Sequence, residues 1–315
     1  MIQRLLVRTL LVLMLLQVAT SCRQSRTEPG GAKKVGVATT LFPLYDFTRA
    51  VAGDRAEVSL ILPPGVEPHS FEPKPEDIVR INRAGLFVFS SKYMEPWAED
   101  ILKGVDKGRV LAVEAGAGVT FLPAAEHGGE EEKGHRHAEG MDPHIWLSIP
   151  NARKMVDNIA AGLAQKDPAS KDYYLKNAAA FNARLTELDG KFKAGLADCR
   201  TRVFLHGGHF AFGYLAERYG LKYISAYAVS ADAEPTLRKM VALINQMRSN
   251  HLKYIFYEEL ISPTVAETIA RETGASLLKL HGIHNVSKED MDRGVTYISL
   301  MEQNLTNLRT GLECR

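Results

Sequence analysis

Short runs rich in β-branched and aromatic residues alternate with helical segments along the chain, and this alternation occurs twice. Four runs lie before residue 120 and four after residue 200, at 35–40, 58–62, 86–89, 109–113, 202–205, 223–227, 254–257 and 276–280. Strands separated by helices form βαβ units with parallel sheets, and 315 residues are enough for two such lobes. The sequence therefore predicts an α/β protein with mainly parallel sheets, an N-terminal lobe at 35–167 and a C-terminal lobe at 200–315.

The segment between the predicted lobes, residues 168–199, carries an apolar stripe with spacings of three and four residues. Its members are Tyr174, Ala178, Phe181, Leu185, Leu188, Phe192 and Leu196. This period is typical of one helix face, and Pro168 suits a helix start. At ~1.5 Å per residue, such a helix is about 40 Å long. We expect one rigid connecting helix; the alternative is two helices separated at Gly190.

The N-terminus has the composition of an export signal. Residues 1–21 contain Arg4 and Arg8, then a short apolar stretch and small residues that end directly before Cys22. The apolar stretch is shorter than the roughly 20 residues of a membrane-spanning helix. Residues 19–22 resemble a bacterial lipobox, with Ala19 where Leu is usual, so we expect Cys22 to be lipidated; a plain signal peptide is the alternative. Residues 22–34 then form a flexible tether.

Two cysteines remain after Cys22, and both lie in a chain that we expect to be exported. In an oxidising compartment, two such cysteines more often pair than stay free. Cys199 precedes a predicted strand and Cys314 follows the last helix. A Cys199–Cys314 disulfide would hold the C-terminus in place, whereas two unpaired buried thiols are the alternative.

Charge argues against nucleic acid as a partner. After residue 21 the chain contains 37 basic and 37 acidic residues, and no basic stripe is evident. Nucleic-acid-binding proteins usually concentrate lysine and arginine on one face. The exported body is therefore expected to bind something other than a polyanion.

Four histidines follow four different predicted strands, two in each lobe: His69, His144, His209 and His281. In open α/β sheets, ligands bind beyond the carboxyl ends of the strands. Two of the histidines also directly follow prolines, which stiffen the backbone. Imidazole is the commonest zinc ligand, so four imidazoles from two lobes predict a metal site in the cleft between them.

These segments resemble the metal-specific solute-binding lipoproteins of bacterial ABC importers, the zinc/manganese-binding group. The resemblance covers nearly all of the chain from Lys34 onward, and its strongest motifs lie at 67–77, 142–147, 209–221 and 255–259. It implies two α/β lobes joined by a long helix, with a divalent ion bound between them. It also implies that His69, His144 and His209 are the first three ligands.

The fourth ligand departs from the family pattern. Many members carry aspartate after the last strand, whereas this sequence has Leu280-His281-Gly282. His281 is therefore the expected fourth ligand, with an unused position as the alternative. We expect His284 to cap the following helix or face solvent, and His206 to lie in the core or on the surface. A site of imidazoles without a carboxylate favours zinc over manganese.

A second group of histidines lies in the loop 126–139, which contains His127, His135, His137 and five acidic residues. Such a segment can hold cations weakly, although a solvated charged loop explains the same composition. In the resembling family, zinc-specific members tend to carry a His- and acid-rich loop here, thought to collect or sense zinc.

The expected function is to capture Zn²⁺ outside the cytoplasm and deliver it to an ABC importer. The implied partners are a membrane permease and the divalent ion, and we expect a monomer that is periplasmic or on the cell surface. Alternatives with the same site are a binding protein for manganese or another divalent metal, a surface adhesin and a metal buffer. An exported zinc hydrolase would need an open coordination position with a general base, and no His-Glu-x-x-His motif is present. We therefore expect no enzyme.

Overall fold

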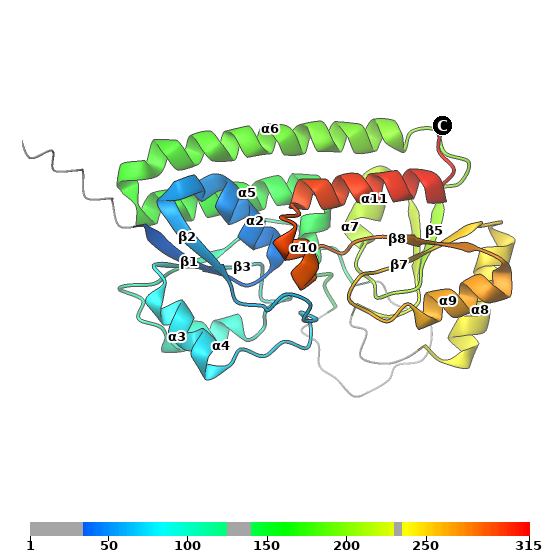
Figure 1. The fold of residues 1–315 in the computed structure, drawn as a ribbon, viewed down its shortest axis with the longest axis horizontal. Helices are drawn as coiled ribbons and strands as arrows, with labels where there is room; N and C mark the ends of the chain where they lie inside the picture. Colours follow the sequence, from blue (N-terminus) through cyan, green and yellow to red (C-terminus); the bar gives the residue numbers. More distant parts are fainter. Residues whose placement is uncertain (1–33, 125–139, 230–234) are drawn as a thin grey trace, which may run out of the picture. The chain divides into compact units, whose positions relative to one another are not determined.

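The predicted strands form two four-stranded parallel sheets, one in each lobe (Figure 1). The first sheet has the order β2-β1-β3-β4, with β1 (Val35–Thr39), β2 (Ala56–Leu60), β3 (Leu86–Phe89) and β4 (Leu111–Glu114). The second repeats this arrangement as β6-β5-β7-β8, with β5 (Val203–His206), β6 (Lys222–Ser225), β7 (Tyr254–Tyr257) and β8 (Ser276–Lys279). The predicted fold class is confirmed.

The structure is a computed structural model that describes residues 34–124, 140–229 and 235–315. Within it, Val35–Arg315 form one compact unit. The predicted signal peptide, the tether, Cys22 and the loop 126–139 with His127, His135 and His137 lie outside the described residues. In the part of the chain that is described, no helix has the length and apolar character needed to cross a membrane.

Helices cover both faces of each sheet. In the first lobe, α2 (Phe42–Ala52) and α5 (Ile149–Lys166) lie on one face, and α3 (Pro75–Arg83) and α4 (Ala98–Gly104) lie on the other. Strand residues alternate accordingly: Val37 and Val88 join the core beside α2 and α5, whereas Ala38 and Phe87 join the core beside α3 and α4. Three-residue 3₁₀ turns lie at Gly53–Arg55 and Ile145–Leu147.

The second lobe has the same layers. One face of its sheet carries α7 (Gly213–Tyr219) and α11 (Tyr297–Gly311), and the other carries α8 (Leu237–Ser249) and α9 (Thr264–Thr273). The short α10 (Lys288–Asp292) precedes α11 and begins at Ser287, whose Oγ accepts a hydrogen bond from Asp290 N.

The connecting helix is continuous. After a 3₁₀ turn at Pro168–Ser170, α6 runs over Lys171–Gly195 without a break at Gly190. The predicted apolar stripe is buried along its whole length. The helix ends earlier than residue 199 because the Arg202 guanidinium donates to the Leu196 carbonyl and to carbonyls at the end of α7, and so caps two helix ends.

A second helix, α11, runs beside α6 and also connects the lobes (Figure 1). At its start, Tyr297 N donates to Asp46 Oδ2 of the first lobe at 2.9 Å. Beyond its end, Cys314 is bonded to Cys199, which closes 115 residues of chain. The largest hydrophobic cluster contains side chains of both lobes, such as Phe47 and Phe204. The two lobes are therefore held together by two helices and a shared core.

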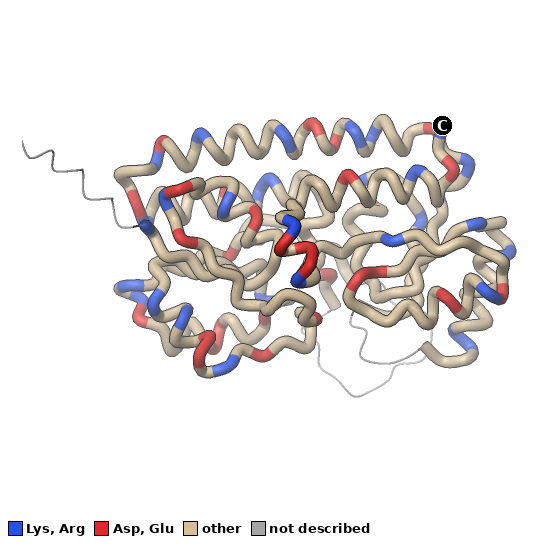
Figure 2. The backbone as a smooth tube through the Cα atoms, viewed as in Figure 1, with Lys and Arg blue, Asp and Glu red and all other residues tan. Residues whose placement is uncertain are grey.

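Lysine and arginine positions are interspersed with aspartate and glutamate positions along the described backbone, as Figure 2 shows. Most ion pairs of the described residues have at least one exposed partner, and in some, such as Lys191 with Glu302 at 2.8 Å, both are exposed. Exposed pairs of this kind contribute little to stability. The charges relevant to function are the buried ones.

Candidate metal centre

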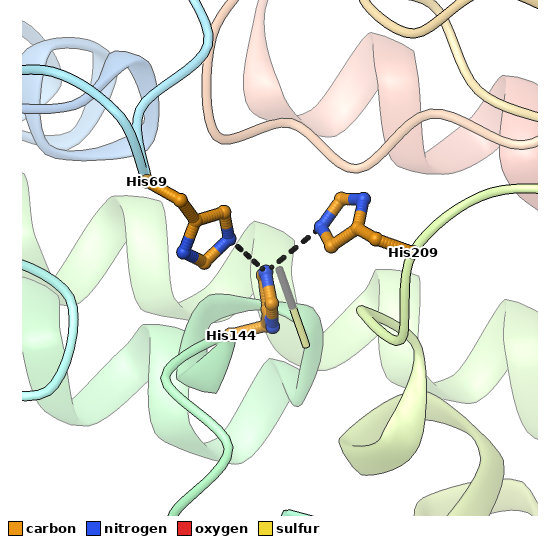
Figure 3. Close-up of side chains that lie close together, drawn as sticks. All are labelled: His69, His144 and His209. Carbon is orange, nitrogen blue, oxygen red and sulfur yellow. Dashed lines mark hydrogen bonds between the residues drawn. The ribbon is translucent and has the colours of Figure 1, made fainter. Parts of the chain in front are cut away.

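Three of the predicted histidines meet between the lobes. The Nε2 atoms of His69 and His209 each lie 3.1 Å from His144 Nε2. All three ligand atoms lie within 4.8 Å of one another, and Figure 3 shows the three rings turned toward a common point. Three convergent imidazole nitrogens are the donor set of a zinc site.

His69 lies on the irregular segment that follows β2. The segment is held from the opposite lobe, because Asn285 Nδ2 donates to the carbonyls of Pro63 and Val66, each at 2.8 Å. Gly65 N also donates to Val286 O at 2.8 Å. His69 is the one member of the cluster that is only partly buried. It is therefore on the side from which an ion can enter.

His144 is fully buried and is oriented by an aspartate two residues earlier. Asp142 Oδ1 lies 2.8 Å from His144 Nδ1 and accepts a hydrogen bond from His144 N at 3.0 Å. The segment is also held by the second lobe, because Tyr214 Oη donates to Asp142 O and Trp146 Nε1 donates to Gly282 O. Nε2 is thus left to face the other two histidines.

His209 follows β5 through two glycines and is oriented by a glutamate at the end of β7. Its Nδ1 lies 2.6 Å from Glu258 Oε2, and its backbone N–H donates to Glu258 Oε1 at 2.8 Å. A Cβ on Gly208 would lie 1.9 Å from Glu258 Oε1. Glycine at 208 is therefore what allows the carboxylate to approach. The helix α7 begins at Gly213, four residues after His209.

Burial and ion pairing shift the pKa values of these groups in opposite directions. Burial lowers the pKa of His144 well below its ordinary value. Burial also disfavours protonated His209, but the Glu258 carboxylate outweighs it and raises the pKa of that imidazole. His209 in turn overcomes the burial of Glu258 and lowers the pKa of its carboxyl to about 2. Burial raises the pKa of Asp142 to about 7.

His281, the predicted fourth ligand, lies outside the cluster. Asn304 of α11 fixes its backbone, since His281 N donates to Asn304 Oδ1 at 2.7 Å and Asn304 Nδ2 donates back to His281 O at 2.8 Å. Its ring Nδ1 lies 2.9 Å from Glu259 Oε1 and accepts a hydrogen bond from Ile283 N at 2.9 Å. Glu259 and Ile283 thus contact Nδ1, the buried Nε2 has no hydrogen-bond partner among the described residues, and His281 is not among the three histidines whose nitrogens converge.

His284 takes the place next to the cluster, which corrects the expectation that it caps a helix or faces solvent. The side chain is fully buried, and its ring centroid lies 5.5 Å from that of His209 and 6.4 Å from that of His144. Among the described residues, neither ring nitrogen has a hydrogen-bond partner. Buried imidazoles normally have such partners, so this ring is unusual.

The backbone before His284 explains how the ring reaches this position. Ile283 is buried and has φ +62°, a left-handed conformation that is rare for a β-branched residue. A Cβ on Gly282 would lie 2.8 Å from two ring atoms of His284. A sequence pattern does not reveal such a turn, so the position of His284 beside the cluster could not be predicted from it.

The remaining histidine of this region is not part of the cluster. His206 is fully buried on β5, which agrees with a core position, and burial lowers its pKa to about 4. Asp142 and Glu258 were not predicted as site residues, although both lie in motifs that carry the family resemblance. The signal for Asp142 is its spacing of two residues from His144.

Comparison with known proteins agrees with this geometry. The family model described as "Zinc-uptake complex component A periplasmic" (ZnuA) matches residues 37–311. The chain is similar to the high-affinity zinc uptake system protein ZnuA of Bacillus subtilis, with 37% identity over 300 residues and 94% of each chain covered. It is also 37% identical over 282 residues to the zinc-binding lipoprotein AdcA of Streptococcus pneumoniae, covering 88% of this chain and 55% of AdcA.

Solved structures show the same fold. The metal-dependent lipoprotein YcdH from Bacillus subtilis has a TM-score of 0.76 and 38% identity, covering 89% of this chain and 99% of that one. The Zn(II)-bound ZnuA-like domain of Streptococcus pneumoniae AdcA has a TM-score of 0.76 and 35% identity, with the same coverage.

Proposed function

The chain belongs to the ZnuA family, the periplasmic components of zinc-uptake complexes, and from this premise we propose that it captures one Zn²⁺ for an ABC importer. The observation that carries the proposal is the convergence of three imidazole Nε2 atoms between the lobes. The protein acts outside the cytoplasmic membrane, and its partner is the membrane permease of the importer.

We propose His69, His144 and His209 as ligands and His284, in place of His281, as the fourth. His284 is supported by its burial, its two unpartnered ring nitrogens and its place beside His209 and His144. A fourth imidazole completes a tetrahedral zinc site and leaves no open position for water. Such a closed site holds the ion without activating a nucleophile, in keeping with a carrier rather than an enzyme.

The donor set supports zinc over manganese. Imidazole nitrogens suit zinc, whereas manganese prefers oxygen ligands and binds nitrogen sites more weakly in the Irving–Williams order. Asp142 and Glu258 point their oxygens at histidine Nδ1 atoms, so they support the ligands rather than replace them.

The proposed mechanism of zinc release follows from the distribution of the ligands between the two lobes. His69 and His144 come from the first lobe and its following segment, whereas His209 and His284 come from the second. A small tilt of one lobe against the other, imposed by the permease, separates the two pairs and weakens the site. All four imidazoles belong to one chain, so a monomer contains the complete site.

The test is competitive titration of metal-free protein. We expect one tight Zn²⁺ per chain, by elemental analysis after dialysis and by competition with a chromophoric chelator. Manganese should displace zinc only at a large excess. Displacement at comparable concentrations would overturn the zinc assignment, and absence of a tight zinc site would overturn the function.

A further inference from the structure

A buried carboxylate lies directly behind each of two proposed ligands, one in each lobe. We propose that Asp142 and Glu258 make the centre selective for a divalent ion over Cu⁺, because they fix two negative charges beside the bound metal. The inference rests on the proposed zinc-binding function and adds to it a reason for rejecting a monovalent ion.

Among the described residues, the Asp142 carboxylate forms no ion pair with a lysine or an arginine. It is fully buried, and its Oδ1 faces both Nδ1 and the backbone N–H of His144. Its Oδ2 has no hydrogen-bond partner. Among the described residues, its one ion-pair contact is with His144. A divalent ion bound to His144 favours the charged form of the carboxyl that faces the far side of the ring.

Glu258 repeats the arrangement from the other lobe. Its side chain is 1% exposed, its Oε2 lies 2.6 Å from His209 Nδ1, and its Oε1 accepts from His209 N at 2.8 Å. In the described part of the chain, it too forms an ion pair with a histidine and with no lysine or arginine. Each carboxylate therefore faces the proposed ion through one imidazole ring.

The charges balance for a divalent ion. Neutral imidazoles contribute no charge, so Zn²⁺ and the two carboxylates sum to zero. Cu⁺ in the same site leaves one buried negative charge uncompensated, and an unpaired buried charge is strongly unfavourable. The nearby Glu259, whose side chain is 5% exposed, faces His281 instead of one of the proposed ligands.

Imidazoles alone do not provide this selectivity. They coordinate copper as well as zinc, so a site of neutral histidines accepts either ion. The carboxylates behind the ligands are thus the groups that distinguish ions by charge.

The same carboxylates also orient their imidazoles, and the test has to separate the two roles. Asp142→Asn removes the charge and keeps one oxygen that can accept from both N–H groups of His144, whereas Glu258→Gln removes the charge and keeps an acceptor for one of the two N–H groups of His209. Loss of an outer partner typically lowers metal affinity about 10–100-fold. A lost orientation weakens every metal, whereas a lost charge weakens the divalent ion selectively.

We therefore compare Zn²⁺ and Cu⁺ affinities of the full exported chain, the two single variants and their double variant. Zinc is titrated against a chromophoric chelator, and Cu⁺ against bicinchoninate under anaerobic conditions with ascorbate. Only Cu⁺ that zinc displaces is counted. Glu259→Gln is the matched control, because it removes a carboxylate from the adjacent residue, where the carboxylate faces His281 and neither His144 nor His209.

We expect each single variant to lose about 10–100-fold in zinc affinity while Cu⁺ affinity changes less than about threefold. The double variant should show the largest shift in selectivity, and Glu259→Gln a smaller one. Parallel losses for both ions would overturn the proposal. The two positions lie in different lobes, so if one variant fails to fold, as judged by thermal unfolding, the other still decides. Weak zinc binding by the unaltered protein would instead refute the proposed function.

Discussion

At the scale of single residues, two histidines of one short loop differ in what surrounds their rings. His281 is directed to Glu259, and His284 has two unpartnered nitrogens beside the cluster. We expect His284→Ala to weaken zinc binding at least tenfold and His281→Ala to change it less than about threefold, in line with ligand and outer positions.

The controls for that pair are the three converging histidines. His69→Ala, His144→Ala and His209→Ala should each weaken binding more than either loop variant, because each removes one of the nitrogens within 4.8 Å of the others. Chelator competition at fixed pH measures all five. If His281→Ala proved more harmful than His284→Ala, our choice of fourth ligand would be incorrect.

Zinc binding should depend on pH through the metal-free state. The pKa of His209 is raised by Glu258, and that of Asp142 is about 7 because of burial. A raised pKa means that the proton is held up to a higher pH and competes with the ion. Affinity should therefore fall as pH drops below about 7, by roughly tenfold per unit for each proton displaced. Constant affinity from pH 8 to 6 would contradict this.

At the scale of elements, replacing either of two helical glycines by alanine should change the free energy of unfolding, in opposite directions. A Cβ on Gly162 of α5 would lie 2.3 Å from Val113 Cγ2 of β4, whereas Gly190 of α6 is exposed and has nothing within 4 Å. We expect Gly162→Ala to lower the free energy of unfolding by about 1–3 kcal/mol through overpacking. Gly190→Ala should raise it by about 0.5–1 kcal/mol. Urea titration measures both, and stabilisation by Gly162→Ala would show that α5 can shift from the sheet.

The contrast between helix and loop also shows what a sequence can predict. The apolar stripe from Tyr174 to Phe192 predicted α6, because its spacing of three and four residues can be read directly from the sequence. The strand ends predicted where His69, His144 and His209 gather, because parallel strands end on one edge. The positions of His281 and His284 depend on the φ of Ile283 and on the hydrogen bonds between His281 and Asn304, which lies 23 residues after His281. Neither appears in a local pattern.

At the scale of the whole molecule, the Cys199–Cys314 bond and the metal centre lie at opposite ends of β5. Cys199 precedes that strand and His209 follows it. Replacing both cysteines by serine should lower the free energy of unfolding by about 2–5 kcal/mol and leave zinc affinity within about threefold. Thermal unfolding tests the predicted loss of stability, and chelator competition tests the predicted zinc affinity. A large loss of affinity would mean that the bond also supports the site.

The return of the chain from the second lobe to the first has a consequence for biosynthesis. The His284 carbonyl accepts a hydrogen bond from Phe42 N. Asn285 donates to Pro63, which lies 222 positions earlier in the chain, and Tyr297 donates to Asp46, which lies 251 positions earlier. A chain that emerges N-terminus first exposes the partners of these residues long before the residues themselves arrive. Contacts of such long sequence separation form slowly. We therefore expect the first lobe to remain incompletely packed until residues 281–315 have been synthesised. The metal centre is then among the last parts of the protein to form.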